Sequence, residues 1–114
     1  MRYLAKIFKA LSDTNRLRIL KMLEIRPLCV CEIREVLNLA NSTVSKHLSV
    51  LRDTEFIIDE KDGKWVNYRL NKKEPNEYVE LILPMIQKWL PDNKTVLRDR
   101  QMVDRVDRVK ICGL

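Results

Sequence analysis

Apolar residues recur three or four positions apart through the first half of the chain, which is the spacing of one face of an α-helix. This pattern predicts four helices, at about residues 3–11, 14–25, 32–39 and 42–54. Ser12 and Asp13 are expected to cap the second helix, because such side chains accept hydrogen bonds from first-turn N–H groups. Asn41 or Ser42 is expected to cap the fourth helix in the same way. Pro27 ends the second helix, since the residue before a proline disfavours helical backbone.

The pattern changes to short strands after the fourth helix. Phe56–Ile58 and Trp65–Leu70 are rich in β-branched and aromatic residues, and the second segment alternates apolar and polar positions. The Asp-Gly pair at 62–63 is a strong signal for a tight hairpin turn, and Lys61 and Lys64 flank it. A hairpin with a basic tip after a helix-turn-helix is the arrangement of a winged-helix domain.

Two more helices are predicted after the hairpin, from Asn76 to about Pro91 and over residues 94–110. The first carries a wide apolar stripe, formed by Tyr78, Leu81, Ile82, Met85, Ile86 and Trp89. Pro84 lies inside this stripe and should kink or split the helix, because proline lacks the backbone N–H that a helix uses. The stripe is too wide for a lone exposed helix, so it must pack on the rest of the domain, on a partner subunit, or on both.

The order of these elements predicts a mainly α fold with a small β-hairpin, that is, an α+β winged helix-turn-helix with C-terminal helices. We expect residues 1–73 to form the DNA-binding core. Residues 74–114 are expected to supply the C-terminal helices for dimerisation and a tail, within the same single domain. A length of 114 residues suits one domain with a modest core.

Composition and charge narrow the classes of function. No apolar run approaches the roughly 18 residues that a membrane-spanning helix needs, and the first residues do not resemble a signal segment. A soluble cytoplasmic protein with no membrane partner is therefore expected. Residues 1–73 hold 15 Lys and Arg against 9 Asp and Glu, while residues 74–114 hold 7 of each. This asymmetry favours nucleic acid at the N-terminal part, although an incidental bias of a solvated surface explains it equally well.

The helix predicted at 42–54 carries the candidate DNA-contacting residues. Val44, Leu48 and Leu51 share its apolar face. The other faces carry Ser42, Thr43, Ser45, Lys46, His47 and Ser49. Small hydroxyl residues around a lysine can approach base edges and phosphates, although an ordinary amphipathic surface helix has the same pattern. The wing lysines, Lys61 and Lys64, are expected to add phosphate contacts.

Two of the three cysteines, Cys29 and Cys31, lie one residue apart directly before the predicted third helix. Thiolates are soft ligands that select soft metals and metalloids, and the N-terminus of a helix favours the thiolate form. Trivalent arsenic or antimony is satisfied by three thiolates, whereas zinc takes four ligands. Together with Cys112, the pair fits a three-coordinate metalloid better than zinc. The alternative is that the pair is two small buried apolar side chains and Cys112 an incidental thiol of the tail.

Three segments make the chain resemble the ArsR/SmtB family of metal-sensing repressors, over roughly residues 3–73. Leu11–Leu20 resembles the second-helix signature of that family, Leu28–Ile33 its arsenic, cadmium and lead-sensing box, and Ser42–Leu48 its recognition-helix signature. The resemblance implies a homodimer built from the first helix and the helices after the wing. It also implies repression of an operator by the metal-free form, and no enzymatic activity.

The implied partner is double-stranded operator DNA with an inverted repeat, because a two-fold dimer presents two recognition helices. The implied inducer is As(III) or Sb(III), with Cd(II) and Pb(II) as further candidates, and no constitutive cofactor is expected. Arg34 stands where arsenic-sensing relatives often carry a third cysteine, and the remaining thiol is that of Cys112. The sequence leaves undecided whether Cys112 reaches Cys29 and Cys31, within one subunit or across the dimer. No cysteine precedes Cys29, and no histidine follows His47, which argues against a zinc site in the dimer helix. His47 is expected to face DNA or flank the helix.

Two other functions remain open at this point. The first is the same fold used as a redox switch, in which oxidation of the cysteines is the signal. An odd number of cysteines, however, does not favour a disulfide framework. The second is a small thiol enzyme such as a reductase. The chain lacks a Cys-x-x-Cys motif, a phosphate-binding loop and a base beside a cysteine, so the enzyme is disfavoured.

Overall fold

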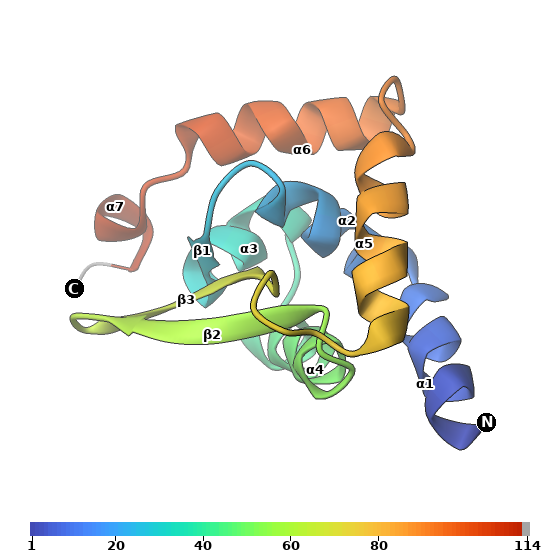
Figure 1. The fold of residues 1–114 in the computed structure, drawn as a ribbon. Helices are drawn as coiled ribbons and strands as arrows, with labels where there is room; N and C mark the ends of the chain where they lie inside the picture. Colours follow the sequence, from blue (N-terminus) through green and yellow to red (C-terminus); the bar gives the residue numbers. More distant parts are fainter. Residues whose placement is uncertain (113–114) are drawn as a thin grey trace.

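The computed structural model describes residues 1–112, in which helices surround a small sheet (Figure 1). The helices of this part of the chain are α1 (Arg2–Leu11), α2 (Thr14–Leu23), α3 (Val30–Leu37), α4 (Asn41–Asp53), α5 (Glu77–Lys88), α6 (Lys94–Arg105) and α7 (Arg108–Cys112). The strands are β1 (Leu28–Cys29), β2 (Ile57–Asp62) and β3 (Trp65–Leu70). The predicted winged helix-turn-helix, mainly α with a small β-hairpin, is confirmed.

The helix ends agree only in part with the sequence prediction. Asp13 caps α2 and accepts hydrogen bonds from two first-turn N–H groups at 2.8 and 3.1 Å. Ser12 instead ends α1, where its hydroxyl donates back to the helix. The prediction for α4 is wrong, because its N-cap is Ala40, whose methyl group offers no hydrogen bond, and Asn41 and Ser42 already belong to the helix.

A strand that the sequence pattern did not predict ties the cysteine pair to the wing. β1 pairs antiparallel with β3, so that Leu28 lies opposite Tyr68 and Cys29 opposite Asn67. The sheet order is β1-β3-β2, which puts β3 in the centre. Two residues are too few to give an alternating pattern, so β1 is recognisable only from its pairing.

The wing is the β2–β3 hairpin, and its turn lies one residue later than predicted. Asp62 pairs with Trp65, so the two turn residues are Gly63 and Lys64. Gly63 has a φ of +63° at the first of these positions, where a type II′ hairpin turn requires a left-handed residue. Lys64 therefore belongs to the tip of the wing itself, and Lys61 lies in β2.

One hydrophobic core joins the two parts of the chain. Its members from residues 1–73 include Ile7, Leu20, Ile33, Leu48, Phe56 and Ile57. Its members from the C-terminal helices are Val79, Leu83, Ile86 and Val103. Because the C-terminal helices contribute to the same core, a displacement of one part changes the packing of the other.

Pro84 was expected to kink or split its helix, and the structure shows that it does not split it. α5 runs without interruption from Glu77 to Lys88, with Pro84 inside it and its ring exposed. A proline removes one helical hydrogen bond, but Val79 and Ile86 are buried in the core on either side of it. We infer that this burial keeps the helix continuous through Pro84.

The single helix predicted for residues 94–110 is also wrong, because the chain bends between α6 and α7. Val106 has extended backbone, with φ −71° and ψ 140°, so α6 ends at Arg105. Arg26 donates to the carbonyl oxygens of Val103 and Val106 at 3.0 and 3.2 Å, which satisfies groups that the end of α6 leaves unpaired. Past this bend, α7 lies beside α3 (Figure 1).

Candidate metal centre and nucleic-acid interface

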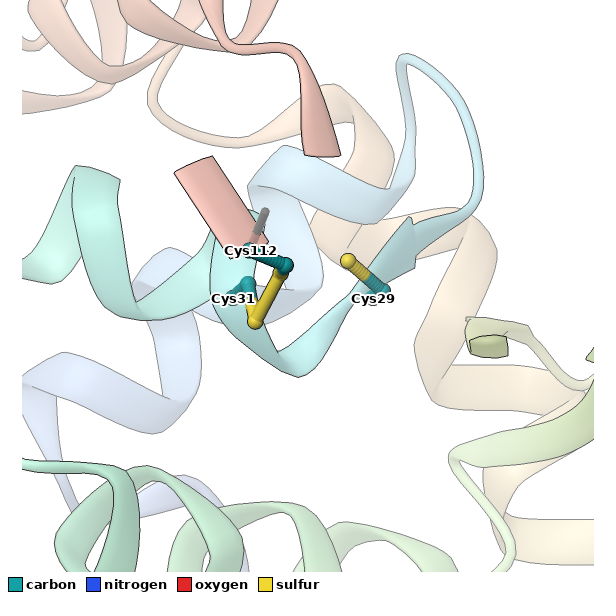
Figure 2. A group of neighbouring side chains, drawn as sticks. All are labelled: Cys29, Cys31 and Cys112. Carbon is teal, nitrogen blue, oxygen red and sulfur yellow. A yellow bond between two sulfur atoms is a disulfide. The ribbon is translucent and has the colours of Figure 1, made fainter. Parts of the chain in front are cut away.

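The three cysteines, which are far apart in the sequence, meet in one cluster. Cys29 ends β1, Cys31 lies in the first turn of α3, and Cys112 is the last residue of α7. Their sulfur atoms all lie within 4.8 Å of one another. Figure 2 shows the Cys29 side chain directed toward the sulfurs of the other two. Cys112 thus lies beside Cys29 and Cys31 of the same subunit, a contact that the sequence left undecided.

Two of the three sulfurs are bonded in this structure, in contrast to the free thiols expected from sequence. Cys31 and Cys112 form a disulfide with a Cα–Cα distance of 6.1 Å, and Cys29 is free and buried. Two sulfurs bound to one soft ion at about 2.3 Å each can lie no more than about 4.6 Å apart. After reduction, small side-chain rotations therefore suffice to bring all three thiolates onto one ion.

Cys29 occupies a dry and tightly specified position. It is the N-cap of α3, it is 3% exposed, and its backbone N–H donates to the Glu32 carboxylate at 3.0 Å. Burial raises the pKa of the Cys29 thiol, and the charge of Glu32 raises it further, while the backbone N–H of Glu32 partly offsets both. The thiol is therefore protonated at neutral pH until a ligand replaces the proton.

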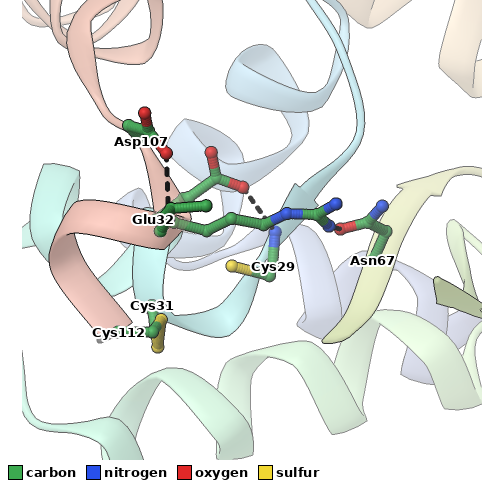
Figure 3. The surroundings of a disulfide bond; sticks show 8 residues. Cys29, Cys31, Glu32, Asn67, Asp107 and Cys112 are labelled. Carbon is green, nitrogen blue, oxygen red and sulfur yellow. Dashed lines mark hydrogen bonds between the residues drawn. A yellow bond between two sulfur atoms is a disulfide. The ribbon is translucent and has the colours of Figure 1, made fainter. Parts of the chain in front are cut away.

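Glu32 is a residue of the site that the sequence analysis missed. Its carboxylate is almost fully buried, holds the Cys29 N–H and forms an ion pair with Arg26 at 3.0 Å. Figure 3 shows this carboxylate between the cysteine backbone and the C-terminal segment. A signal existed, because a glutamate three residues after an N-cap is the spacing of a capping box. Cysteine is an uncommon N-cap, which concealed it.

Arg108, at the start of α7, connects the tail to the wing. Its guanidinium donates to Asp62 at 2.8 Å and to Asn67 at 3.1 Å, and it lies 4.2 Å from the centre of the Trp65 ring. The hydrogen bond and the charge of Arg108 lower the pKa of Asp62 below its ordinary value, and a hydrogen bond that Asn67 donates to Asp62 adds to this effect. Figure 3 places Asn67 on β3, close to the cysteine cluster. No sequence signal marked Arg108, because the contact depends on the bend before α7.

The predicted recognition helix presents most of its polar residues outward. Val44, Leu48 and Leu51 are buried, as the pattern predicted. The exposed residues are Ser42, Thr43, Ser45 and Lys46, and Ser49 is half-buried. The outer face of α4 is therefore free to approach a duplex, and the role of these residues in DNA binding stays a prediction.

His47 is less free than its neighbours. Its Nδ1 lies 3.2 Å from Nη1 of Arg16, a residue of α2 whose guanidinium also donates to the last carbonyls of α1. Because an arginine only donates, Nδ1 must accept and the proton of the neutral ring must be on Nε2. His47 thus connects α4 to α2, and its edge that carries Nε2 is the one left for DNA.

The wing carries both predicted lysines, but its charge is more mixed than the sequence suggested. Lys61 and Lys64 are exposed, and the Lys64 ammonium lies 4.9 Å from the centre of the Trp65 ring. The acidic residues of β2 are paired with arginines, in the ion pairs Arg52–Asp59, Arg69–Glu60 and Arg108–Asp62. The lysines are therefore the cations of the wing that remain available to phosphates.

Comparison with known proteins identifies the family. Residues 13–59 match the model of the family described as bacterial regulatory protein, arsR family. The arsenic resistance transcriptional regulator ArsR2 of Pseudomonas putida is 37% identical over 110 residues, which cover 93% of this chain and 94% of that protein. The arsenical resistance operon repressor of Escherichia coli is 41% identical over 71 residues, 61% of each chain.

Solved structures give the same result for the fold. Reduced HlyU from Vibrio cholerae superposes with a TM-score of 0.61 and 28% identity, over 75% of this chain and 85% of that one. No helix within residues 1–112 is long and apolar enough to cross a membrane. The relatives and the fold are those of transcriptional regulators and not of thiol enzymes. The chain belongs to the arsR family of bacterial regulatory proteins, as its three motifs indicated.

Proposed function

We propose that this protein represses transcription by binding operator DNA as a homodimer, and that arsenite or antimonite releases it by binding the thiolates of Cys29, Cys31 and Cys112. The observation that carries the proposal is the meeting of three sulfurs, from three separate elements, within 4.8 Å. Relatives that act in arsenic resistance support the same class of inducer. Cadmium and lead are secondary candidates, supported by a 36% identical relative named for cadmium resistance.

The chemistry of the cluster favours a three-coordinate metalloid. Arsenous acid condenses with three thiols: each As–O bond is replaced by an As–S bond, and each hydroxyl leaves as water with one thiol proton. Zinc needs a fourth ligand, and over residues 1–112 the cluster contains only the three cysteines. The nearby Glu32 carboxylate is already engaged by Arg26 and by the Cys29 N–H. A trivalent ion is therefore the better fit.

DNA binding is assigned to α4 and the wing of each subunit. The outer residues of α4 would contact base edges and phosphates, and Lys61 and Lys64 would contact phosphates. Two-fold symmetry would set two α4 helices in successive major grooves about 34 Å apart, on an inverted repeat. Exposed apolar side chains of α1 and α5 supply a surface for dimerisation, namely Tyr3, Phe8, Leu81, Met85 and Trp89.

The site is suited to act on DNA binding, because two of its ligands are fixed to the DNA-binding elements. Cys29 is paired with Asn67 in the wing strand β3. Cys31 lies in the first turn of α3, which packs against α4. An ion held by these sulfurs is therefore linked directly to both the wing and the helix-turn-helix. Such coupling between ligands is reciprocal, typically about 5- to 150-fold in affinity.

The test is operator binding by the reduced protein, measured with and without arsenite, antimonite, cadmium, lead and zinc. Arsenite and antimonite should weaken operator binding most. The Cys29→Ser, Cys31→Ser double variant should bind operator with unchanged affinity and ignore arsenite. Operator affinity that arsenite leaves unchanged in the reduced wild type would refute the proposal.

The disulfide favours a second candidate function, a thiol redox switch. An oxidant of the peroxide class would take two electrons from the Cys31 and Cys112 thiols, and their two protons would leave with the peroxide oxygens as two water molecules. This reaction removes two of the three arsenite ligands. Peroxide titration of operator binding, reversed by a dithiol, tests it; release that persists in a Cys112→Ser variant excludes this pair as the switch.

A further inference from the structure

We infer that Arg108 is the positioning residue that carries the signal from the thiol cluster to the wing. The inference rests on the proposed function and adds a route within the subunit. Arg108 and Cys112 are the two ends of α7. One end meets the cluster at Cys31, and the other meets the wing tip at Asp62 and Asn67.

The position of α7 depends on its contacts with the rest of the molecule. The helix has five residues and contributes no buried side chain, so it has little stability of its own. A polar hollow of about 560 Å³, lined by Glu32, Asn67 and Arg108 among others, lies between the α6–α7 segment and the wing. Besides its packing on α3, α7 is therefore held at one end by the sulfur contact of Cys112 and at the other by the guanidinium contacts of Arg108.

The geometry also gives the direction of the effect. In Figure 1 the wing begins beside the recognition helix α4 and its tip reaches the side of the molecule on which α7 lies. Arg108 holds the wing tip from the α7 side, through an ion pair, an amide hydrogen bond and the face of the Trp65 ring. A tip held there is less free to adjust to a duplex that lies against the outer face of α4. An ion that recruits Cys112 thus docks α7 and opposes operator binding.

Other residues of α7 do not make this connection. Lys110 lies in the same helix, is exposed and carries the same charge. Replacing it removes one positive charge from α7 and leaves the contacts of Arg108 with Asp62 and Asn67 intact. Lys110→Ala is therefore the matched control, and Arg108→Lys tests whether charge suffices without the two-pronged geometry of the guanidinium.

The experiment measures operator affinity with and without saturating arsenite for the reduced wild type, Arg108→Ala, Arg108→Lys and Lys110→Ala. Arg108→Ala should keep the operator affinity of the metal-free protein. In this variant the ratio of operator affinity without arsenite to that with arsenite should be roughly 2- to 30-fold smaller than in the wild type. Arg108→Lys should restore only part of the coupling, and Lys110→Ala should match wild type. Because Asp62 and Arg108 form one contact, adding Asp62→Asn to Arg108→Ala should reduce the effect of arsenite on operator affinity no further than Arg108→Ala alone.

A second readout does not depend on DNA. In a Trp89→Phe background, Trp65 is the remaining tryptophan, and arsenite should change its fluorescence. The change should vanish in Arg108→Ala and persist in Lys110→Ala. Full coupling in Arg108→Ala, with arsenite still releasing the wild type, would overturn the inference and leave the proposed function intact. A Trp65 signal that arsenite changes equally in Arg108→Ala would also overturn the inference. If arsenite does not release the wild type from the operator, the proposed function fails, and the inference fails with it.

Discussion

At the scale of single residues, the three cysteines are not equivalent. Cys29 is buried, is held by Glu32 and has a raised pKa, whereas Cys31 and Cys112 are half-buried and joined to each other. The pair at 29 and 31 is visible in the sequence because its members are neighbours. The contact with Cys112 spans 81 residues and depends on the bend before α7, which no local pattern encodes.

Replacing Cys112 by Ser tests whether the remote cysteine is a ligand. The variant should bind arsenite more weakly, and the number of sulfurs around arsenic should fall from three to two, because each subunit then retains two thiols. X-ray absorption at the arsenic edge counts these sulfurs. Three sulfurs in Cys112→Ser would mean that the third comes from the partner subunit.

The pH dependence of binding separates metalloid from divalent ion. A thiol with a raised pKa keeps its proton at neutral pH, so Cd(II) must displace that proton. Cadmium affinity should therefore rise by at least about tenfold per pH unit from pH 6 to 8. Arsenous acid returns each thiol proton as water, so its affinity should stay flat over the same range. Calorimetric titrations at three pH values measure both slopes, and parallel slopes would contradict this account of Cys29.

At the scale of elements, patterns that repeat within one segment were predictable and contacts between segments were not. The apolar faces of α1 to α4 and the hairpin are local and were predicted. β1 has two residues and exists because β3 pairs with it. The apolar spacing of Val103, Val106 and Val109 continues through the bend, so it predicted one helix where Arg26 stabilises a break. Pro84 does not interrupt α5, because the packing of both halves of the helix against the core outweighs the loss of one hydrogen bond.

The wing should contribute affinity more than sequence preference. Lys61 and Lys64 are its unpaired cations, and phosphates carry no sequence information. Replacing both by Ala should weaken binding to all duplexes to a similar extent and reduce the salt slope by up to about two units. Affinity measured across a salt series on operator and unrelated DNA checks this.

The matched control for the wing replaces Lys88 and Lys94, two exposed lysines of α5 and α6, by Ala. This pair removes the same charge at a distance from α4 and the wing. If both double variants lower the slope equally, the effect belongs to net charge, and the hairpin makes no phosphate contact.

At the scale of the whole molecule, buried polar contacts join the C-terminal helices to the DNA-binding part. Arg18 of α2 makes a two-pronged ion pair with Asp99 of α6, at 2.8 and 2.9 Å, and Asp99 is 3% exposed. Lys21 donates to the carbonyls of Ile86 and Trp89 at the end of α5. The sequence indicated two regions of different charge, but charge counts do not reveal that these helices are anchored to α2. The C-terminal helices are therefore joined to α2 by fixed polar contacts as well as by the shared core.

The last prediction concerns dimerisation. α1 and α5 lie side by side and expose large apolar side chains, among which Leu81 is 69% exposed (Figure 1). A buried charge without a partner is strongly unfavourable, so Leu81→Glu should dissociate the dimer while leaving the fold of the subunit intact. Loss of the second half-site contact should then lower affinity for an inverted repeat by roughly 100- to 10,000-fold.

Leu97→Glu introduces the same charge on the exposed surface of α6, outside the proposed interface, and should remain dimeric. Sedimentation velocity gives the oligomeric state and thermal unfolding the integrity of each variant. A folded Leu81→Glu variant that stays dimeric would show that the α1–α5 surface is not the interface. A Leu97→Glu variant that dissociates would place the interface on α6.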